Sequence, residues 1–241
     1  MTNVIRACVI LSFTFSAIFL TACGASSAKI DNQAPTENVP MPEIDSGKPK
    51  IVAFGDSLTA GFGLTEKESY PYLLQEKLKA DGYDYEVINA GVSGDTSAGG
   101  LERIEWTLDQ DNIQILILEL GANDMLRGLS VAQMKKNLDA IIKKAKAKNV
   151  RVLLCGLFPP EAPVTKDQSA FAAAFRDLAK ENNVAFLPFF LENVGGMRTM
   201  NQADGIHPNA EGTRIVTQNV YQALRPLLKN EAESISATRE K

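Results

Sequence analysis

Short apolar runs alternate with longer segments of helical spacing along most of this 241-residue chain. The short runs have the composition of buried strands and cover Ile51–Phe54, Tyr85–Asn89, Ile113–Leu120, Val150–Cys155 and Val184–Leu187. The amphipathic segments predict helices over Tyr70–Ala80, Leu101–Leu108, Val131–Ala147, Ser169–Glu181 and Ala210–Leu228. Because strand and helix alternate, we expect an α/β fold, a three-layer α/β/α sandwich around a five-stranded, mostly parallel sheet.

The N-terminal segment has a different pattern. After Arg6 comes an apolar run, Ala7–Leu20, that is short for a membrane span and matches the hydrophobic region of a secretory signal. We therefore expect residues 1–22 to be a signal peptide and not part of the fold.

The end of that run, Leu20-Thr21-Ala22-Cys23-Gly24, resembles the lipobox of bacterial lipoproteins. The resemblance implies cleavage before Cys23 and lipidation of Cys23, and several acyl chains on one residue anchor a protein stably. By the same resemblance, Gly24 implies the bacterial cell envelope, with the protein held by lipid in the outer membrane and facing the periplasm. The alternative is an ordinary signal peptide that happens to contain a cysteine.

Polar, unpatterned sequence follows the cysteine and returns at the C-terminus. The stretch up to residue 49 is rich in Ser, Pro, Asn and Glu, which is typical of a flexible linker. We expect residues 23–49 to be the lipidated cysteine and its linker, 50–229 a single folded domain, and 230–241 a disordered tail.

Charge and cysteine content exclude several classes of protein. Lys and Arg number 25 against 29 Asp and Glu, a net charge of −4, and the basic residues are scattered, so nucleic-acid binding is excluded. Removal of the signal and lipidation of Cys23 would leave Cys155 as the one free thiol, so no internal disulfide is expected. Cys155 ends an apolar run and is interpreted as a buried small hydrophobe.

The sequence predicts no metal and no cofactor. A chain with one histidine and a single buried cysteine cannot supply the usual zinc ligands, and its carboxylates lack the spacing of metal-binding loops. Gly61-Phe62-Gly63 resembles the start of a dinucleotide loop, but the third glycine of that motif is missing.

Polar motifs follow the predicted strands where parallel strands present their carboxyl ends. They are Gly55-Asp56-Ser57, Gly91-Val92-Ser93-Gly94-Asp95, Gly121-Ala122-Asn123-Asp124 and, in the loop after the fifth strand, Asp204-Gly205-Ile206-His207. Ligands of such sheets bind at that edge, so we expect these motifs to lie together.

With their flanking residues, these motifs resemble the SGNH, or GDSL, hydrolase family. The matching blocks are Phe54–Leu58, Asn89–Ser97, Glu119–Asp124 and Asp204–Asn209, in order and spacing, and the chain is most similar to the bacterial esterase/lysophospholipase/thioesterase I branch. The resemblance covers about residues 50 to 228 and implies a flavodoxin-like fold. It also implies an oxyanion hole made by the backbone N–H groups of Ser57 and Gly94 and the side-chain amide of Asn123. Ala122 departs from the pattern, since many relatives have a second glycine there.

Chemistry supports the same residues. A serine hydroxyl needs a base within hydrogen-bond reach, and the base needs a partner that fixes its tautomer. Ser57, His207 and Asp204 supply these parts, so activity should fall on the acid side of neutrality as His207 protonates. The alternative for Asp204 is a turn or helix N-terminal residue. Asp56 and Asp124 are expected to brace loops.

Two loops, residues 157–163 and 188–200, carry Phe, Leu and Met that suit an apolar or aryl substrate group, although such residues also often cap a core. The leading hypothesis is a serine esterase acting on short to medium acyl or aryl esters, with lysophospholipids and acyl thioesters as further candidates. The alternatives are a carbohydrate O-deacetylase of the cell envelope and a non-catalytic lipid- or glycan-binding lipoprotein.

Overall fold

The structure, a computed structural model, describes residues 47–159 and 165–228. The predicted signal peptide, Cys23, most of the linker and the predicted tail lie outside the described residues. Within the described ranges, no helix has both the length and the apolar character needed to cross a bilayer.

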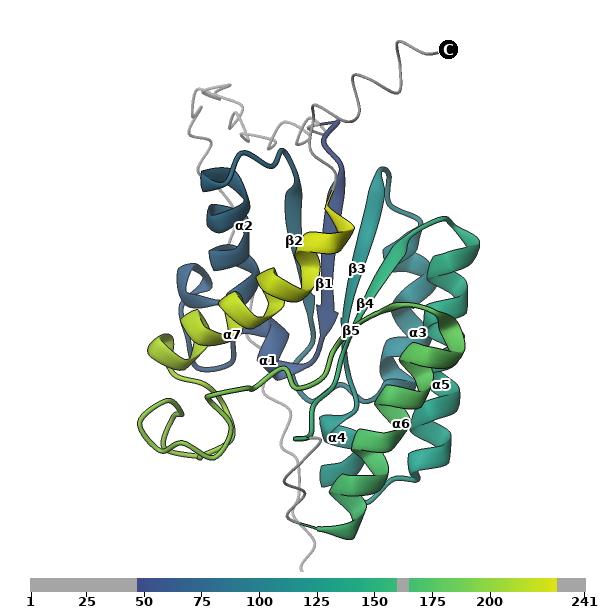
Figure 1. Cartoon of the computed structure of the whole chain (residues 1–241), viewed down its shortest axis with the longest axis vertical. Helices are drawn as coiled ribbons and strands as arrows, with labels where there is room; N and C mark the ends of the chain where they lie inside the picture. Colours follow the sequence, from purple (N-terminus) through teal and green to yellow (C-terminus); the bar gives the residue numbers. More distant parts are fainter. Residues whose placement is uncertain (1–46, 160–164, 229–241) are drawn as a thin grey trace, which may run out of the picture. The chain divides into compact units, whose positions relative to one another are not determined.

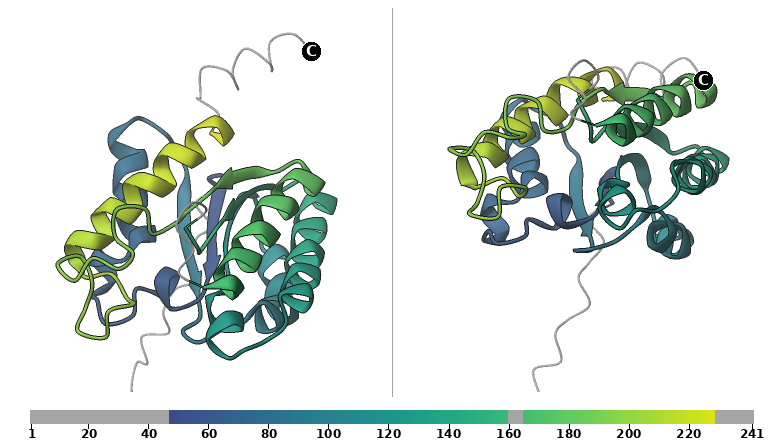
Figure 2. Two further views of the ribbon diagram at one scale, coloured as in Figure 1. Left: turned by 60° about the horizontal axis from the view of Figure 1, so that its bottom comes forward. Right: turned by 90° about the horizontal axis from the view of Figure 1, so that it is seen from below.

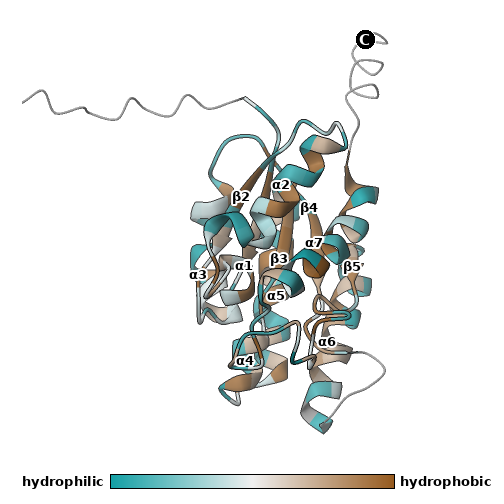
Figure 3. Ribbon diagram, turned by 90° about the vertical axis from the view of Figure 1, so that its left-hand side faces the viewer, coloured by the Kyte–Doolittle hydropathy of each residue, from teal (hydrophilic) through white to brown (hydrophobic). Residues whose placement is uncertain are grey.

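Five parallel strands form one sheet in the order β2-β1-β3-β4-β5. Their bounds are β1 Lys50–Gly55, β2 Glu86–Gly91, β3 Ile113–Glu119, β4 Arg151–Cys155 and β5 Ala185–Leu187. The predicted α/β fold and its sheet are confirmed, and the order is that of flavodoxin-like proteins. Figure 3 shows the strands as largely hydrophobic, as expected for a parallel sheet covered on both faces.

Helices cover the sheet on both sides (Figures 1 and 2). Helices α2 and α7 pack together on one face, while α3, α5 and α6 pack side by side on the other. The long helices are α2 Tyr70–Ala80, α3 Ser97–Leu108, α5 Val131–Ala147, α6 Lys166–Asn182 and α7 Ala210–Leu224. The short ones are α1 Ser57–Ala60, η1 Glu66–Glu68, α4 Ala122–Leu126 and η2 Arg225–Leu227.

Two predicted helix boundaries were wrong by four residues, for identifiable reasons. Helix α3 begins at Ser97 and not at Leu101, because Thr96 caps it by accepting from the Gly99 N–H. Two glycines in that first turn disguise it, since glycine disfavours helix. Helix α7 ends at Leu224, and Pro226 lies in the short 3₁₀ turn that follows.

The topology brings the polar motifs to the carboxyl edge of the sheet. Strand β1 leads directly into α1 and β3 into α4, and both turns were too short to be predicted from periodicity. Strand β1 lies between β2 and β3. The helix that connects β1 to β2, α2, covers one face of the sheet, and the helix that connects β2 to β3, α3, covers the other. The site described next therefore lies at the point where the strand order reverses.

Candidate active site

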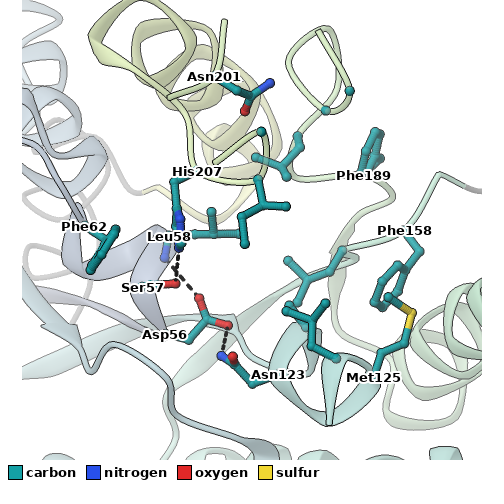
Figure 4. Close-up of a pocket in the computed structure, with 18 of the residues that line it drawn as sticks. Asp56, Ser57, Leu58, Phe62, Asn123, Met125, Phe158, Phe189, Asn201 and His207 are labelled. Atoms are coloured by element: carbon teal, nitrogen blue, oxygen red, sulfur yellow. Dashed lines mark hydrogen bonds between the residues drawn. The ribbon is translucent and has the colours of Figure 1, made fainter. Parts of the chain in front are cut away.

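Ser57 is the first residue of helix α1, and its hydroxyl faces the one histidine of the chain. Asp56 caps the helix, its Oδ1 accepting from the Leu58 N–H at 3.0 Å. The Ser57 Oγ lies 2.9 Å from His207 Nε2, although the two residues are 150 positions apart (Figure 4). The predicted nucleophile and base are thus within hydrogen-bond reach.

Asp204 holds both the turn that carries His207 and the imidazole itself. Its Oδ1 accepts from the N–H groups of Ile206, at 3.0 Å, and His207, at 3.1 Å. Its Oδ2 lies 2.7 Å from His207 Nδ1. Hydrogen bonds from the His207 ring and from these N–H groups lower the pKa of Asp204 to about 2. Asp204 is therefore a turn residue and an imidazole partner at once, while Asn209 caps α7.

Asn123 turns its amide toward the residue beside the nucleophile. From helix α4, its Nδ2 donates to Asp56 Oδ2 at 3.0 Å and to the Asp95 carbonyl at 2.9 Å. Asn123 and Ser57 line the same cavity. Because both amide hydrogens have protein acceptors, donation to a substrate oxyanion requires one of these bonds to be shared or exchanged.

Gly94 lies at the third position of a tight turn closed by the Asp95 N–H donating to the Val92 carbonyl at 3.0 Å. Its φ of +82° is in the left-handed region that glycine permits. A Cβ there would meet only Arg127 Nη2, at 3.5 Å, so the backbone conformation and not crowding within the protein calls for glycine. Arg127 also donates to the Gly94 carbonyl at 2.6 Å.

Two buried carboxyl groups lie beneath the nucleophile. Asp56 is 1% exposed, and burial raises its pKa to about 6. Glu119, at the end of β3, is fully buried, and burial followed by the charge of Asp56 raises its pKa well above its usual range. Glu119 Oε2 accepts from the Thr59 hydroxyl at 2.7 Å and the Asp56 N–H at 3.3 Å. Sequence reasoning gave Glu119 no role, although a lone charge ending an apolar strand was a usable signal.

Arg103 is a second residue that sequence reasoning missed. From α3 it donates to the carbonyls of Gly55, at 3.0 Å, and Ala90, at 2.9 Å, and to Asp95 Oδ2, at 2.8 Å. It thereby joins the ends of β1 and β2 to the Gly94 turn. Asp124 braces the start of α3, accepting from the Ser97 N–H at 2.8 Å and from its hydroxyl at 2.5 Å, as predicted.

A cavity of about 680 Å³ opens beside Ser57 and His207 (Figure 4). The two loops predicted to shape a pocket do contribute, through residues that include Leu157, Phe158, Pro159, Phe189 and Leu191. Residues 160–163 of the first loop lie outside the described residues. The sequence did not predict that apolar side chains near the polar motifs also line it, among them Leu58, Phe62, Met125, Leu126 and Ile206.

Phe190, placed in the pocket loop by the sequence, is instead fully buried and packs edge-on against Tyr70 with ring centroids 5.3 Å apart. Cys155 is buried as predicted, and burial raises the pKa of its thiol well above its usual range. Within residues 47–159 and 165–228, no group of three or more His, Cys, Asp or Glu is arranged to hold a metal ion.

Comparison with known proteins identifies the family of the chain. Residues 53–215 match the model of the GDSL-like lipase/acylhydrolase family. Esterase TesA of Pseudomonas aeruginosa is 42% identical over 178 residues, which are 74% of this chain and 89% of that protein. Thioesterase 1/protease 1/lysophospholipase L1 of Escherichia coli K12 is 35% identical over 182 residues, which are 76% of this chain and 86% of that protein.

A solved structure of TesA superposes with a TM-score of 0.71 at 42% identity, covering 74% of this chain and 99% of that one. The family match spans more than half of the chain, and both of these relatives are matched over most of their length. The chain therefore belongs to the GDSL-like lipase/acylhydrolase, or SGNH, family and is an esterase-type hydrolase.

Proposed function

We propose that this hydrolase cleaves carboxylic esters through an acyl-enzyme formed on Ser57. The observation that carries the proposal is the chain of contacts from Ser57 Oγ to His207 Nε2, 2.9 Å, and from His207 Nδ1 to Asp204 Oδ2, 2.7 Å. Asp204 stays ionised at neutral pH, because hydrogen bonds from His207 and Ile206 lower its pKa to about 2. It can therefore stabilise the imidazolium that forms during the reaction.

In the first half-reaction, Ser57 Oγ attacks the ester carbonyl carbon while His207 Nε2 takes the hydroxyl proton. The tetrahedral intermediate collapses, the bond to the alcohol breaks, and His207 returns the proton to the leaving oxygen. Water then attacks the acyl-serine with His207 again as base, and the acid is released. Asp204 orients the imidazole throughout.

The oxyanion is stabilised by the N–H groups of Ser57 and Gly94 and by the Asn123 amide, which line one cavity. Ser57 begins a helix, where backbone N–H groups have no intrahelical acceptor. For the amide to take part, Asn123 exchanges its bond to the Asp95 carbonyl for one to substrate and keeps Asp56 as its anchor.

The substrates we propose are short to medium acyl or aryl esters, with lysophospholipids and acyl thioesters in the same range. Apolar side chains beside Ser57, among them Leu58, Phe158 and Leu126, suit an acyl chain or an aromatic ring. Hydrolysis of p-nitrophenyl esters of increasing chain length, beside lysophospholipid and acyl-CoA, ranks these classes.

Two serines of the cavity provide the test of mechanism. Ser57→Ala should lower kcat for p-nitrophenyl butyrate by at least about 1,000-fold. Ser93→Ala, at a serine that lines the same cavity but makes no hydrogen bond to His207 among the described residues, should keep most of the activity. Comparable rates for wild type and Ser57→Ala, with intact folding, would contradict the mechanism.

We further propose that Cys23 is lipidated and holds the enzyme at the outer membrane, facing the periplasm. The support is the sequence Leu20-Thr21-Ala22-Cys23-Gly24 after an apolar run. Labelled fatty acid should enter the wild-type chain and Cys8→Ala but not Cys23→Ala, and only the first two should fractionate with membranes. Equal labelling of Cys23→Ala would overturn this proposal.

A further inference from the structure

The loop that carries Asp204 and His207 is a hairpin closed by its own backbone. The Asn209 N–H donates to the Met200 carbonyl at 2.9 Å, and the Gln202 N–H donates to the His207 carbonyl at 2.8 Å. These bonds fix the shape of the hairpin but not its distance from Ser57, which belongs to α1. Proton transfer from Ser57 to His207 depends on that distance.

The side chain of Gln202 spans the two segments. Its Nε2 donates to the Phe62 carbonyl at 2.7 Å and to the Pro208 carbonyl at 3.0 Å. Phe62 lies just beyond α1, and Pro208 directly follows His207. In the part of the chain that the structure describes, no other side-chain hydrogen bond except that of Ser57 with His207 joins residues 57–64 to the hairpin.

The fit around this amide is close on both sides. A Cβ at Gly63 would lie 2.2 Å from Gln202 Oε1, so the backbone turn after α1 passes directly over the Gln202 side chain. Phe62, whose carbonyl accepts from Gln202, also packs its ring against His207, with centroids 4.7 Å apart and the planes at 37°. Phe62 thus joins the segment after the nucleophile to the hairpin twice, through its carbonyl to Gln202 and through its ring to His207.

We propose that Gln202 is a positioning residue that sets the separation of Ser57 Oγ and His207 Nε2. The inference rests on the proposed function, in which these atoms exchange a proton. Gln202 does not line the cavity, so it acts through His207 and not on substrate. Its loss is therefore expected to lower kcat and to leave KM nearly unchanged.

Gln202→Met tests this with little change in side-chain volume, because it removes both donors. The matched control is Gln75→Met, since Gln75 makes the same kind of clamp between α2 and β2, donating to the Tyr85 carbonyl at 3.0 Å and accepting from the Val87 N–H at 2.8 Å. We expect kcat for p-nitrophenyl butyrate to fall by roughly 10- to 100-fold in Gln202→Met, with KM within about twofold. Gln75→Met should keep kcat, whatever it does to thermal stability.

Nuclear magnetic resonance of the one histidine separates positioning from loss of the hairpin. The His207 ring N–H signal that reports on Asp204 should persist in Gln202→Met, because both residues belong to the hairpin, and the acid limb of the kcat profile should stay in place. Gln202→Glu, which places a carboxylate against two carbonyl oxygens, should lose at least as much kcat.

Unchanged kcat in Gln202→Met, an equal loss in Gln75→Met, or disappearance of the ring signal would overturn the inference. Failure of the proposed function is a separate result, in which Ser57→Ala remains active whatever Gln202 does.

Discussion

The side-chain amide of Asn123 donates to Asp56 Oδ2 at 3.0 Å, so the residue that precedes the nucleophile also holds the amide that faces the cavity. Strands β1 and β3, which deliver the two residues, are neighbours in the sheet. Nucleophile and amide are thereby fixed relative to each other before any substrate binds. Hydrogen-bond donors that are preorganised in this way make the largest single contribution to transition-state stabilisation in many enzymes.

Asn123→Ala should lower kcat on the order of 100- to 1,000-fold with a small effect on KM, because the donor is used in the transition state. The matched control is Asn182→Ala, since the Asn182 amide also donates to a carboxylate, Asp139, at 3.0 Å, and to a carbonyl, Leu178, at 3.1 Å, away from the cavity. Steady-state kinetics on both variants measure the difference. Similar kcat values for the two would argue against Asn123 as an oxyanion donor.

Asp204→Asn should lower kcat on the order of 100- to 10,000-fold, since an amide cannot stabilise the imidazolium as a carboxylate does. Steady-state kinetics on the variant measure the loss.

The contribution of Asp204 to the free energy of unfolding depends on pH with a defined sign. The pKa of Asp204 is lowered from 3.8 to about 2, so its contribution to stability is present above pH 3.8 and is lost as pH falls through about 2. Chemical denaturation should show that loss in wild type and not in Asp204→Asn; parallel curves would contradict the assignment.

The contribution of Asp56 to the free energy of unfolding depends on pH with the opposite sign. Burial raises its pKa from 3.8 to about 6, so its stabilising contribution is present below pH 3.8 and is lost as pH rises through about 6. Asp56→Asn should flatten this part of the stability profile, measured by urea denaturation. Absolute stability is not the readout, because an amide there also loses the bond from Asn123. An unchanged profile would count against a raised pKa.

Two exposed leucines test the acyl pocket. Leu126 is 62% exposed and lines the cavity, whereas Leu129 is 45% exposed and does not. Leu126→Ala should reduce kcat/KM for an octanoyl ester several-fold and leave the acetyl ester unchanged, since each buried methylene contributes about 0.8 kcal/mol. Leu129→Ala should change neither. Equal losses on both esters in Leu126→Ala would indicate damage to the site and not a lost acyl contact.

The sequence predicts the sheet because its strands are largely apolar, and it predicts the site because polar motifs follow those strands. The single histidine of the chain identifies the candidate base, and Ser57 follows from its place after the first strand and from the family resemblance. The role of Gln202 could not be predicted from the sequence, because it depends on a tertiary contact with the turn at Gly63. Arg103 is similar, since its acceptors are backbone carbonyls that the fold brings together.

The pocket was predicted only in part for the same reason. Loops rich in Phe and Leu were identified, but packing decides which side chains face the cavity. Phe190 is buried in the core, whereas Ile206 and Leu126 line the cavity. The first turn of helix α3 was not predicted because it contains two glycines. It forms nevertheless, because Thr96 caps it. Local propensity is overridden in each case by a contact made elsewhere in the fold.

Reaction with a fluorophosphonate, followed by peptide mass spectrometry, tests the central claim most directly. Ser57 should carry the adduct in the wild-type enzyme, with esterase activity lost in proportion to labelling, because the hydroxyl is activated by His207 at 2.9 Å. Ser57→Ala should not react, and His207→Ala should react far more slowly. An adduct on another residue, or full labelling of Ser57→Ala, would contradict the account.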